Sequence, residues 1–266
     1  MVQALHKPSD IRALVSDEEW QVRVDLAAAY RLVDYYGWTD MIFTHLSARV
    51  PGPEHHFLIN PYGMMFDEVT ASDLVKIDLD GNVVLSAGYD VNPAGFCIHS
   101  AIHMAREDAK AVMHLHTDDG VAVSTMADGL MPITQTAMVI YNEVAYHEYE
   151  GVALDLSERE RLVADIGDKR LLMLRNHGTL AVGENVSDCF LMLYSLERAC
   201  TMQVRALAGG VDIYRPSQAA LETTRRQGES LMAPGALDVA PLCTLIVVSG
   251  LHGFILFIIV PIEVFF

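Results

Sequence analysis

The sequence predicts a mixed α/β fold in which helices cover a largely antiparallel sheet. Helix-like and strand-like segments alternate, and hairpin signals join some of the strands. The clearest hairpin pairs Val75–Ile77 with Val83–Leu85 across the turn Asp78-Leu79-Asp80-Gly81-Asn82. The 266 residues are enough for one sizeable domain, and we find no internal repeat. We therefore expect one α/β domain rather than a doubly wound sheet.

The first clear helix begins after Ser16, which forms a capping box with Glu19 three residues later. Apolar residues then recur at helical spacing before a stop signal at Gly37: Val22, Leu26, Ala29 and Val33. The segment Met41–Val50 reads as a strand that ends at a Pro-Gly-Pro loop, and His56–Ile59 reads as a further short strand.

Asn92-Pro93 has the composition of a helix entrance, and this helix leads to a buried strand at Ala111–Leu115. Strands are expected again at Ala137–Tyr141 and Leu171–Leu174. A last long helix is expected from about Ser187 to Ala208, before a Gly-Gly stop.

Three histidines are the strongest functional signal. His114 and His116 are two residues apart at the end of a predicted strand, so their side chains share one face. His177 follows another predicted strand and precedes Gly178, where the backbone can turn sharply. Three neutral imidazoles with one open position suit a catalytic divalent metal. Because the chain has eleven histidines, spacing alone also leaves a structural role open.

Composition excludes several classes of function. The formal charge is −17, with 35 acidic against 18 basic residues and no basic run, so nucleic acid is not an expected partner. The cysteines lack CxxC spacing and read as reduced packing residues: Cys97, Cys189, Cys200 and Cys243. The first residues carry no apolar signal core. We therefore expect a cytoplasmic protein.

Five motifs in order give the stretch from about Trp20 to Gly209 a resemblance to the class II aldolase and adducin head-domain family. They are Thr44-His45-Leu46-Ser47-Ala48-Arg49, Leu58-Ile59-Asn60-Pro61-Tyr62-Gly63, His99-Ser100-Ala101-Ile102, His114-Leu115-His116-Thr117 and Asn176-His177-Gly178. The resemblance implies a three-layer α/β/α sandwich around a mostly antiparallel central sheet, over residues 1–235. It also implies a homotetramer with sites near subunit boundaries. Zinc, or another divalent metal such as iron or manganese, is implied on His114, His116 and His177.

The sequence departs from the sugar-phosphate aldolases that the family contains. Those enzymes carry a glutamate that binds the resting metal and transfers a proton. It lies four residues before the position of His99, where this chain has Gly95. A general acid or base contributes about 100- to 10,000-fold in rate, so this loss matters. The phosphate-binding residues are also replaced, by Thr44-His45 and Pro93-Ala94, although Gly63 is retained. The pattern is similar to the adducin-like branch of the family.

The resemblance and these departures predict a divalent-metal-dependent lyase that performs aldol cleavage or decarboxylation on a small carbonyl or hydroxy-acid substrate without phosphate. Candidates for the catalytic proton donor are His99, Tyr141 and a metal-bound water, and candidates for substrate binding are His45 and Gly63. His45 is considered as a protonated imidazole that binds an anion. Two alternatives stay open: an iron-dependent oxidative decarboxylase, and a non-catalytic adducin-like module for actin or cytoskeletal binding.

The composition changes abruptly near the end of the chain. Residues 236–266 are almost wholly apolar, and Glu263 is the only charge after Asp238. The run approaches the ~20 residues needed to span a bilayer, but glycines and a proline interrupt it and no basic residue flanks it. The two interpretations are a membrane anchor, which would make the membrane a partner, and an artefact of the sequence.

Overall fold

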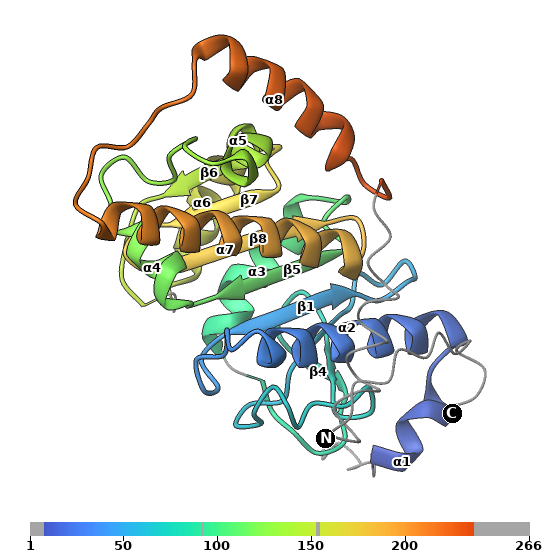
Figure 1. The fold of residues 1–266 in the computed structure, drawn as a ribbon. Coiled ribbons are helices and arrows are strands. Elements are labelled where there is room, and N and C mark those ends of the chain that lie inside the picture. Colours follow the sequence, from blue (N-terminus) through green and yellow to red (C-terminus); the bar gives the residue numbers. More distant parts are fainter. Residues whose placement is uncertain (1–7, 92, 153–154, 237–266) are drawn as a thin grey trace, which may run out of the picture.

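The structure, a computed structural model, describes residues 8–91, 93–152 and 155–236. In these ranges eight strands form one sheet in the order β4-β3-β2-β1-β5-β8-β7-β6 (Figure 1). The strands are β1 His45–Arg49, β2 Phe57–Ile59, β3 Val75–Ile77, β4 Val83–Leu85, β5 Ala111–Leu115, β6 Val144–His147, β7 Leu171–Leu174 and β8 Gly178–Gly183. All neighbouring pairs are antiparallel except β6 and β7, which are parallel. The mostly antiparallel sheet that we predicted is confirmed.

Helices lie on both faces of this sheet, which confirms the three-layer architecture (Figure 1). The α-helices are α1 Pro8–Ile11, α2 Asp17–Tyr35, α3 Pro93–Ala105, α4 Asp118–Ser124, α5 Gln135–Ile140, α6 Arg159–Ile166, α7 Val186–Ala208 and α8 Gln218–Leu231. Short 3-10 turns are η1 Arg12–Leu14, η2 Tyr141–Glu143 and η3 Leu156–Glu158. Helices α2 and α7 cover one face, and α3 and α6 cover the other.

The alternation of side chains along the strands divides the core into two layers. On β5, Met113 packs with the buried residues of α2 and α7, whereas Val112 packs with those of α3 and α6. On β8, Ala181 and Leu180 divide in the same way. His114 follows the parity of Val112, so its imidazole belongs to the face that α3 covers.

Local signals account for several elements. Helix α2 begins after Ser16, whose Oγ accepts a hydrogen bond from the amide of Glu19 at 3.1 Å. The reciprocal half of the capping box is replaced, because the Glu19 carboxylate binds Arg23 and Lys76 instead. The β3–β4 hairpin has the predicted pairing, with Ile77 opposite Val83.

One predicted element is too long: the strand expected at Met41–Val50 begins only at His45, after a turn in which Met41 has φ +48°. Two other expectations about elements were wrong. The segment predicted as a strand at Ala137–Tyr141 is α5 followed by η2, because Thr134 caps a helix and Ala137 and Ile140 are buried three residues apart. The strand comes next, as β6. The second miss is α8, which packs against α5 and which we did not expect.

No helix within the described ranges is both long and apolar enough to cross a membrane. The apolar tail that the sequence shows at residues 236–266 lies outside the described residues, apart from residue 236.

Candidate metal centre

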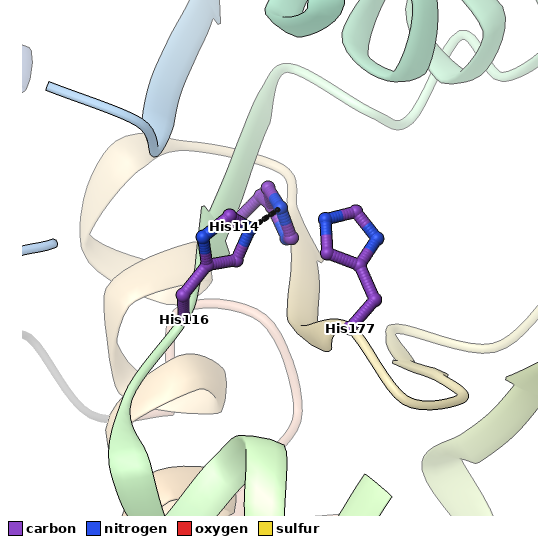
Figure 2. A group of neighbouring side chains, drawn as sticks. All are labelled: His114, His116 and His177. Atoms are coloured by element: carbon purple, nitrogen blue, oxygen red, sulfur yellow. Dashed lines mark hydrogen bonds between the residues drawn. The ribbon is translucent and has the colours of Figure 1, made fainter. Parts of the chain in front are cut away.

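The structure brings the three predicted histidines together. His114 lies in β5, one residue before the end of the strand, and His116 is the first residue after it. His177 lies in the turn between β7 and β8. Their ring centroids are 4.7–4.8 Å apart (Figure 2). One ring nitrogen from each lies within 4.8 Å of the others, so the three form a candidate metal-binding group.

The antiparallel pairing of β5 with β8 brings these histidines together, with Leu115 opposite Thr179. The turn before β8 has its left-handed residue at Asn176, with φ +57°, and not at Gly178. Gly178 instead lies where the two strands approach closely, because a Cβ there would be 2.3 Å from the carbonyl oxygen of Leu115. Our expectation that Gly178 makes the turn was therefore wrong, although glycine is still required.

Outer hydrogen bonds set the tautomers of two of the histidines. Nδ1 of His114 donates to the carbonyl oxygen of Thr179 at 2.9 Å, and Nδ1 of His116 donates to the carboxylate of Asp40 at 3.0 Å. Both acceptors lack hydrogen, so either ring, when it is neutral, has its lone pair on Nε2. Such outer partners are typical of metal-binding histidines.

The donor set fits a divalent cation. The two Nε2 atoms of His114 and His116 are 2.9 Å apart, and two facing lone pairs at that distance repel unless a cation or a proton lies between them. Two nitrogens on one tetrahedral zinc would be about 3.3 Å apart, given Zn–N bonds of about 2.05 Å. Burial lowers the pKa of His114, and burial together with His116 and His147 lowers the pKa of His177 to about 4. These rings are therefore neutral at pH 7 and can bind a metal.

Glu197 on α7 supports the cluster from the opposite face of the sheet, and our reasoning from the sequence missed it. Its carboxyl group accepts hydrogen bonds from the hydroxyls of Thr117 and Thr179, which come from the two chain segments that carry the histidines. Burial raises the pKa of Glu197 to about 7. The only sequence signal is a charged residue among apolar neighbours in a long helix, which does not identify its partners.

His45 lies beside the cluster. It is directly opposite His114 in the β1–β5 pairing and is only 3% exposed. Burial, with smaller effects of His116 and His177, lowers its pKa to about 4. The expectation that a protonated His45 binds an anion at neutral pH is therefore corrected: the imidazole is neutral because it is desolvated among other imidazoles.

The remaining candidates are not members of the three-histidine group. His99 on α3 is fully buried, and its Nδ1 is 2.6 Å from Oγ of Ser47. Tyr141 lies in η2, is 38% exposed, and has no hydrogen bond to the cluster among the described contacts. Gly63 has φ +89° in a turn and has open space where a Cβ would be.

Comparison with known proteins decides the family. A family model described as the class II aldolase and adducin N-terminal domain matches residues 24–204. The chain belongs to this family. A Caulobacter vibrioides protein assigned provisionally to the class 2 aldolases is 61% identical over 218 residues, which cover 82% of this chain and 85% of that protein. Rat alpha-adducin is 47% identical over 196 residues, which cover 72% of this chain and 26% of the adducin.

Solved structures of the family have the same fold. An aldolase II superfamily protein from Pseudomonas syringae superposes with a TM-score of 0.85 at 50% identity, covering 90% of this chain and 96% of that one. L-fuculose 1-phosphate aldolase from Glaciozyma antarctica superposes with a TM-score of 0.77 at 29% identity, covering 89% and 91%. The family therefore includes both aldolases and adducin head domains.

Proposed function

We propose that this class II aldolase-family protein is a divalent-metal-dependent lyase that cleaves a carbon–carbon bond in a small carbonyl or hydroxy-acid substrate without phosphate. The observation that carries the proposal is the cluster of His114, His116 and His177, in which outer acceptors hold Nδ1 of the first two rings and their Nε2 atoms face each other at 2.9 Å. A structural role without a metal would need a proton between these two nitrogens instead.

The proposed roles at the metal centre are metal binding and the orientation of the metal-binding rings. His114, His116 and His177 would hold the ion, and Thr179 and Asp40 orient the first two rings. A divalent ion there would act as a Lewis acid that polarises a substrate carbonyl. The partial exposure of His116 and His177 leaves that side of the cluster open to a small molecule.

The absence of a phosphate group in the proposed substrate follows from the neighbours of the cluster. The sugar-phosphate aldolases that the sequence resembles have small polar residues where this chain has Thr44-His45. Here the His45 imidazole is buried and neutral, so it offers no positive charge to a phosphate dianion. Gly63 remains a proposed substrate-loop residue, because it is exposed and its φ of +89° is a conformation that residues with a side chain rarely adopt.

The proton donor in the proposed reaction is not the glutamate of the aldolases, since Gly95 stands at that position. Tyr141 is 38% exposed and makes no hydrogen bond to the cluster of its own chain among the described contacts, so we assign it to the site of a neighbouring subunit in the predicted homotetramer. This assignment predicts that Tyr141→Phe lowers turnover without lowering metal content.

The test is the metal content of the full chain purified without added metal, measured beside His114→Ala/His116→Ala. His55→Ala/His56→Ala is the matched control, since it also replaces two neighbouring histidines but none of the three in the cluster. Circular dichroism of all three proteins would show whether each is folded. We expect about one divalent ion per chain in the wild type and in the control, and none in the cluster variant.

The identity of the ion separates the candidate functions. Zinc or manganese supports the lyase, and substrate screening would then use chelating keto and hydroxy acids. Iron would favour the iron-dependent oxidative decarboxylase. A folded wild-type protein that neither contains metal nor binds added zinc would overturn both enzymes. It would leave the adducin-like interaction module, which the 47% identity to rat alpha-adducin keeps as the competing proposal.

A further inference from the structure

A row of buried polar side chains continues from the metal centre along the face of the sheet that α3 covers. His45 and Ser47 are two residues apart on β1, so they share this face. His99 and His103 are four residues apart on α3 and lie over them. All four are at most 3% exposed. Buried polar groups are costly unless they are hydrogen-bonded, so each group in the row needs a partner.

The direction of the hydrogen bonds in this row follows from its outer end. Nδ1 of His103 is 3.0 Å from the carbonyl oxygen of Ala109, which can only accept, so this nitrogen carries the hydrogen. Burial lowers the pKa of His103 to about 3, so the ring is neutral and its Nε2 has a lone pair. Oγ of Ser47 is 2.8 Å from that Nε2 and 3.5 Å from the carbonyl oxygen of Val112, so its hydrogen goes to the nearer acceptor, Nε2 of His103.

The tautomer of His99 is then determined. Oγ of Ser47 is 2.6 Å from Nδ1 of His99, and its only hydrogen is already donated to His103. Nδ1 of His99 must therefore be the donor. Burial lowers the pKa of His99 well below its usual value, so this ring is neutral too. Its Nε2 is a buried acceptor that has no hydrogen-bond partner among the described residues. We call His103, Ser47 and His99 the Ser47 relay.

The inner end of the Ser47 relay meets His45. The ring centroids of His45 and His99 are 6.0 Å apart and the rings are inclined at 85°. Nε2 of His45 is also buried, and no described residue forms a hydrogen bond with it. Beneath this ring is Gly95, where a Cβ would lie 2.6 Å from Cγ and 2.8 Å from Nδ1 of His45. On the other side His45 is the direct cross-strand neighbour of His114. The imidazole therefore occupies the space that any side chain at position 95 would need.

We propose that Gly95 and the Ser47 relay position the ring of His45 beside the three metal-binding histidines, and that His45, not His99, is the imidazole that contacts the ligand. Ser47, His99 and His103 are positioning residues that act through His45. The assignment of His45 to ligand contact rests on the proposed function, whereas the relay and its tautomers do not. The proposal also explains why α3 has a glycine in its first turn, where a Cβ would displace the ring.

The tautomers can be measured directly by nitrogen-15 NMR of the imidazole rings in the full chain. We expect His99 and His103 to carry hydrogen on Nδ1 and to have an unprotonated Nε2. Ser47→Ala removes the acceptor of His99 Nδ1, so the His99 ring should change or mix its tautomer. Ser100→Ala is the matched control, because Ser100 is also buried but bonds only to carbonyls of its own helix, and it should leave His99 unchanged. Finding hydrogen on Nε2 of His99 in the wild type would overturn the relay.

The position of His45 is tested by Gly95→Ala, alone and combined with His45→Ser. Gly95→Ala should lower the unfolding midpoint and shift the ring signals of His45, and the double variant should regain most of that loss. Gly209→Ala is the control, since a Cβ there meets no atom nearer than 3.7 Å. If Gly95→Ala lowers the unfolding midpoint equally with His45 present and with His45→Ser, the ring of His45 does not pack against Gly95.

Titration with zinc chloride separates this proposal from the proposed function. If His45 lies beside the bound ion, zinc shifts its ring signals together with those of the three cluster histidines, and the His45 shift shrinks in Gly95→Ala. Zinc that moves the cluster signals but leaves His45 unchanged overturns the ligand-contact role alone. If zinc moves no histidine signal, the proposed function and the ligand-contact role fail, while the tautomers still test the relay.

Discussion

At the scale of single residues, Gly178 shows how closely the backbone sets the metal centre. A methyl group there would lie 2.3 Å from the carbonyl oxygen of Leu115 and 3.1 Å from the ring of His116, and neither the strand nor the ring is free to move away. Gly178→Ala should therefore push β5 and β8 apart at the cluster. We expect a loss of about 1–3 kcal/mol in the free energy of unfolding, the usual cost of overpacking, and a weaker affinity for zinc.

Urea unfolding and zinc titration of the same variant check this prediction. Gly209→Ala, which adds a methyl group in ordinary contact, should change neither quantity by more than about 0.5 kcal/mol. A Gly178→Ala protein with unchanged zinc affinity would show that the close approach of the strands does not set the geometry of the cluster.

Glu197 gives a second prediction at this scale, on the pH dependence of stability. Burial raises its pKa from 4.5 in an unfolded chain to about 7, so between these values the folded protein binds more protons than the unfolded chain. The stabilisation from Glu197 is therefore complete below about pH 4.5 and falls as the pH rises through 7. The total change is about 3 kcal/mol at 1.4 kcal/mol per pKa unit. Glu197→Gln keeps the shape but removes the titration.

The measurement is urea unfolding of the wild type and Glu197→Gln at pH 5, 6, 7 and 8. The stability of the variant relative to the wild type should rise with pH up to about 8. Other titrating groups are common to both proteins and cancel in the difference. If the difference in stability does not change over this pH range, burial does not raise the pKa of Glu197.

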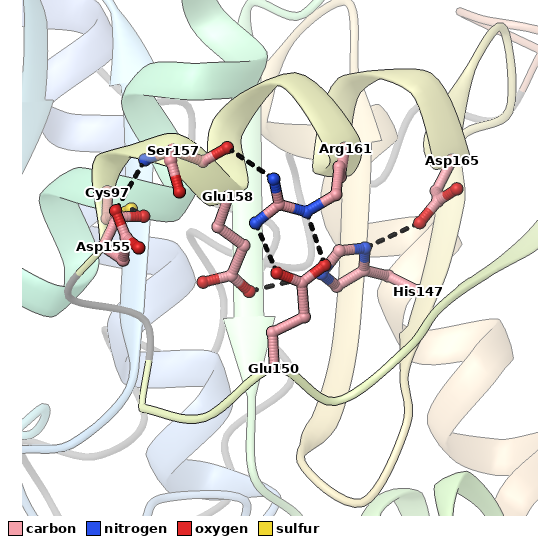
Figure 3. A network of polar contacts seen from close by, with 8 residues as sticks. All are labelled: Cys97, His147, Glu150, Asp155, Ser157, Glu158, Arg161 and Asp165. Carbon is pink, nitrogen blue, oxygen red and sulfur yellow. Dashed lines mark hydrogen bonds and ion pairs between the residues drawn. The ribbon is translucent and has the colours of Figure 1, made fainter.

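At the scale of elements, one histidine of the edge strand β6 binds carboxylates of both η3 and α6. His147 ends β6, with Nδ1 2.7 Å from the carboxylate of Asp165 and Nε2 3.2 Å from that of Glu158 (Figure 3). Glu158 is 7% exposed, so His147→Ala leaves a buried carboxylate without its partner. Removing one partner of a buried pair typically costs about 3–5 kcal/mol, and we expect about 3 kcal/mol here because Asp165 is more exposed.

The same network contains an exposed ion pair that serves as a control, because its removal should cost little stability. Arg161 and Glu150 also form an ion pair in Figure 3, but both side chains are substantially exposed. Arg161→Ala should therefore cost less than about 1 kcal/mol. Chemical denaturation of the two variants checks both values, and similar losses would contradict the importance of burial at His147.

Elements also show what could and could not be predicted from the sequence. The β3–β4 hairpin and the end of β5 follow from local patterns, because turn residues and two-residue spacing act within a few positions. The error at α5 arose because Ala137–Tyr141 is a short apolar run, which periodicity alone does not assign to helix or strand. The contacts of Glu197 with Thr117 and of His45 with Gly95 join residues 80 and 50 positions apart. Such pairs depend on the register of the sheet, which no local pattern contains.

At the scale of the whole molecule, the family resemblance predicts a homotetramer with sites near subunit boundaries. The segment that joins α2 to β1 suits such a boundary: Tyr35, Met41 and Phe43 are each more than half exposed, and the segment also carries Asp40, which orients His116. Exposed apolar patches of this kind mark interaction sites. We therefore expect this segment to lie between subunits, which would couple assembly to the metal centre through Asp40.

Sedimentation of the full chain should give a mass four times that of one subunit. Met41→Asp/Phe43→Asp would introduce two charges into the interface and should shift the protein to smaller species and weaken zinc binding, because Asp40 loses its support. Val211→Asp/Tyr214→Asp changes two exposed apolar residues after α7 and should alter neither property. A wild-type monomer with full zinc affinity would overturn both the tetramer and the coupling. A smaller Met41→Asp/Phe43→Asp species that retains zinc affinity would overturn only the coupling, and Asp40 would then orient His116 without help from a second subunit.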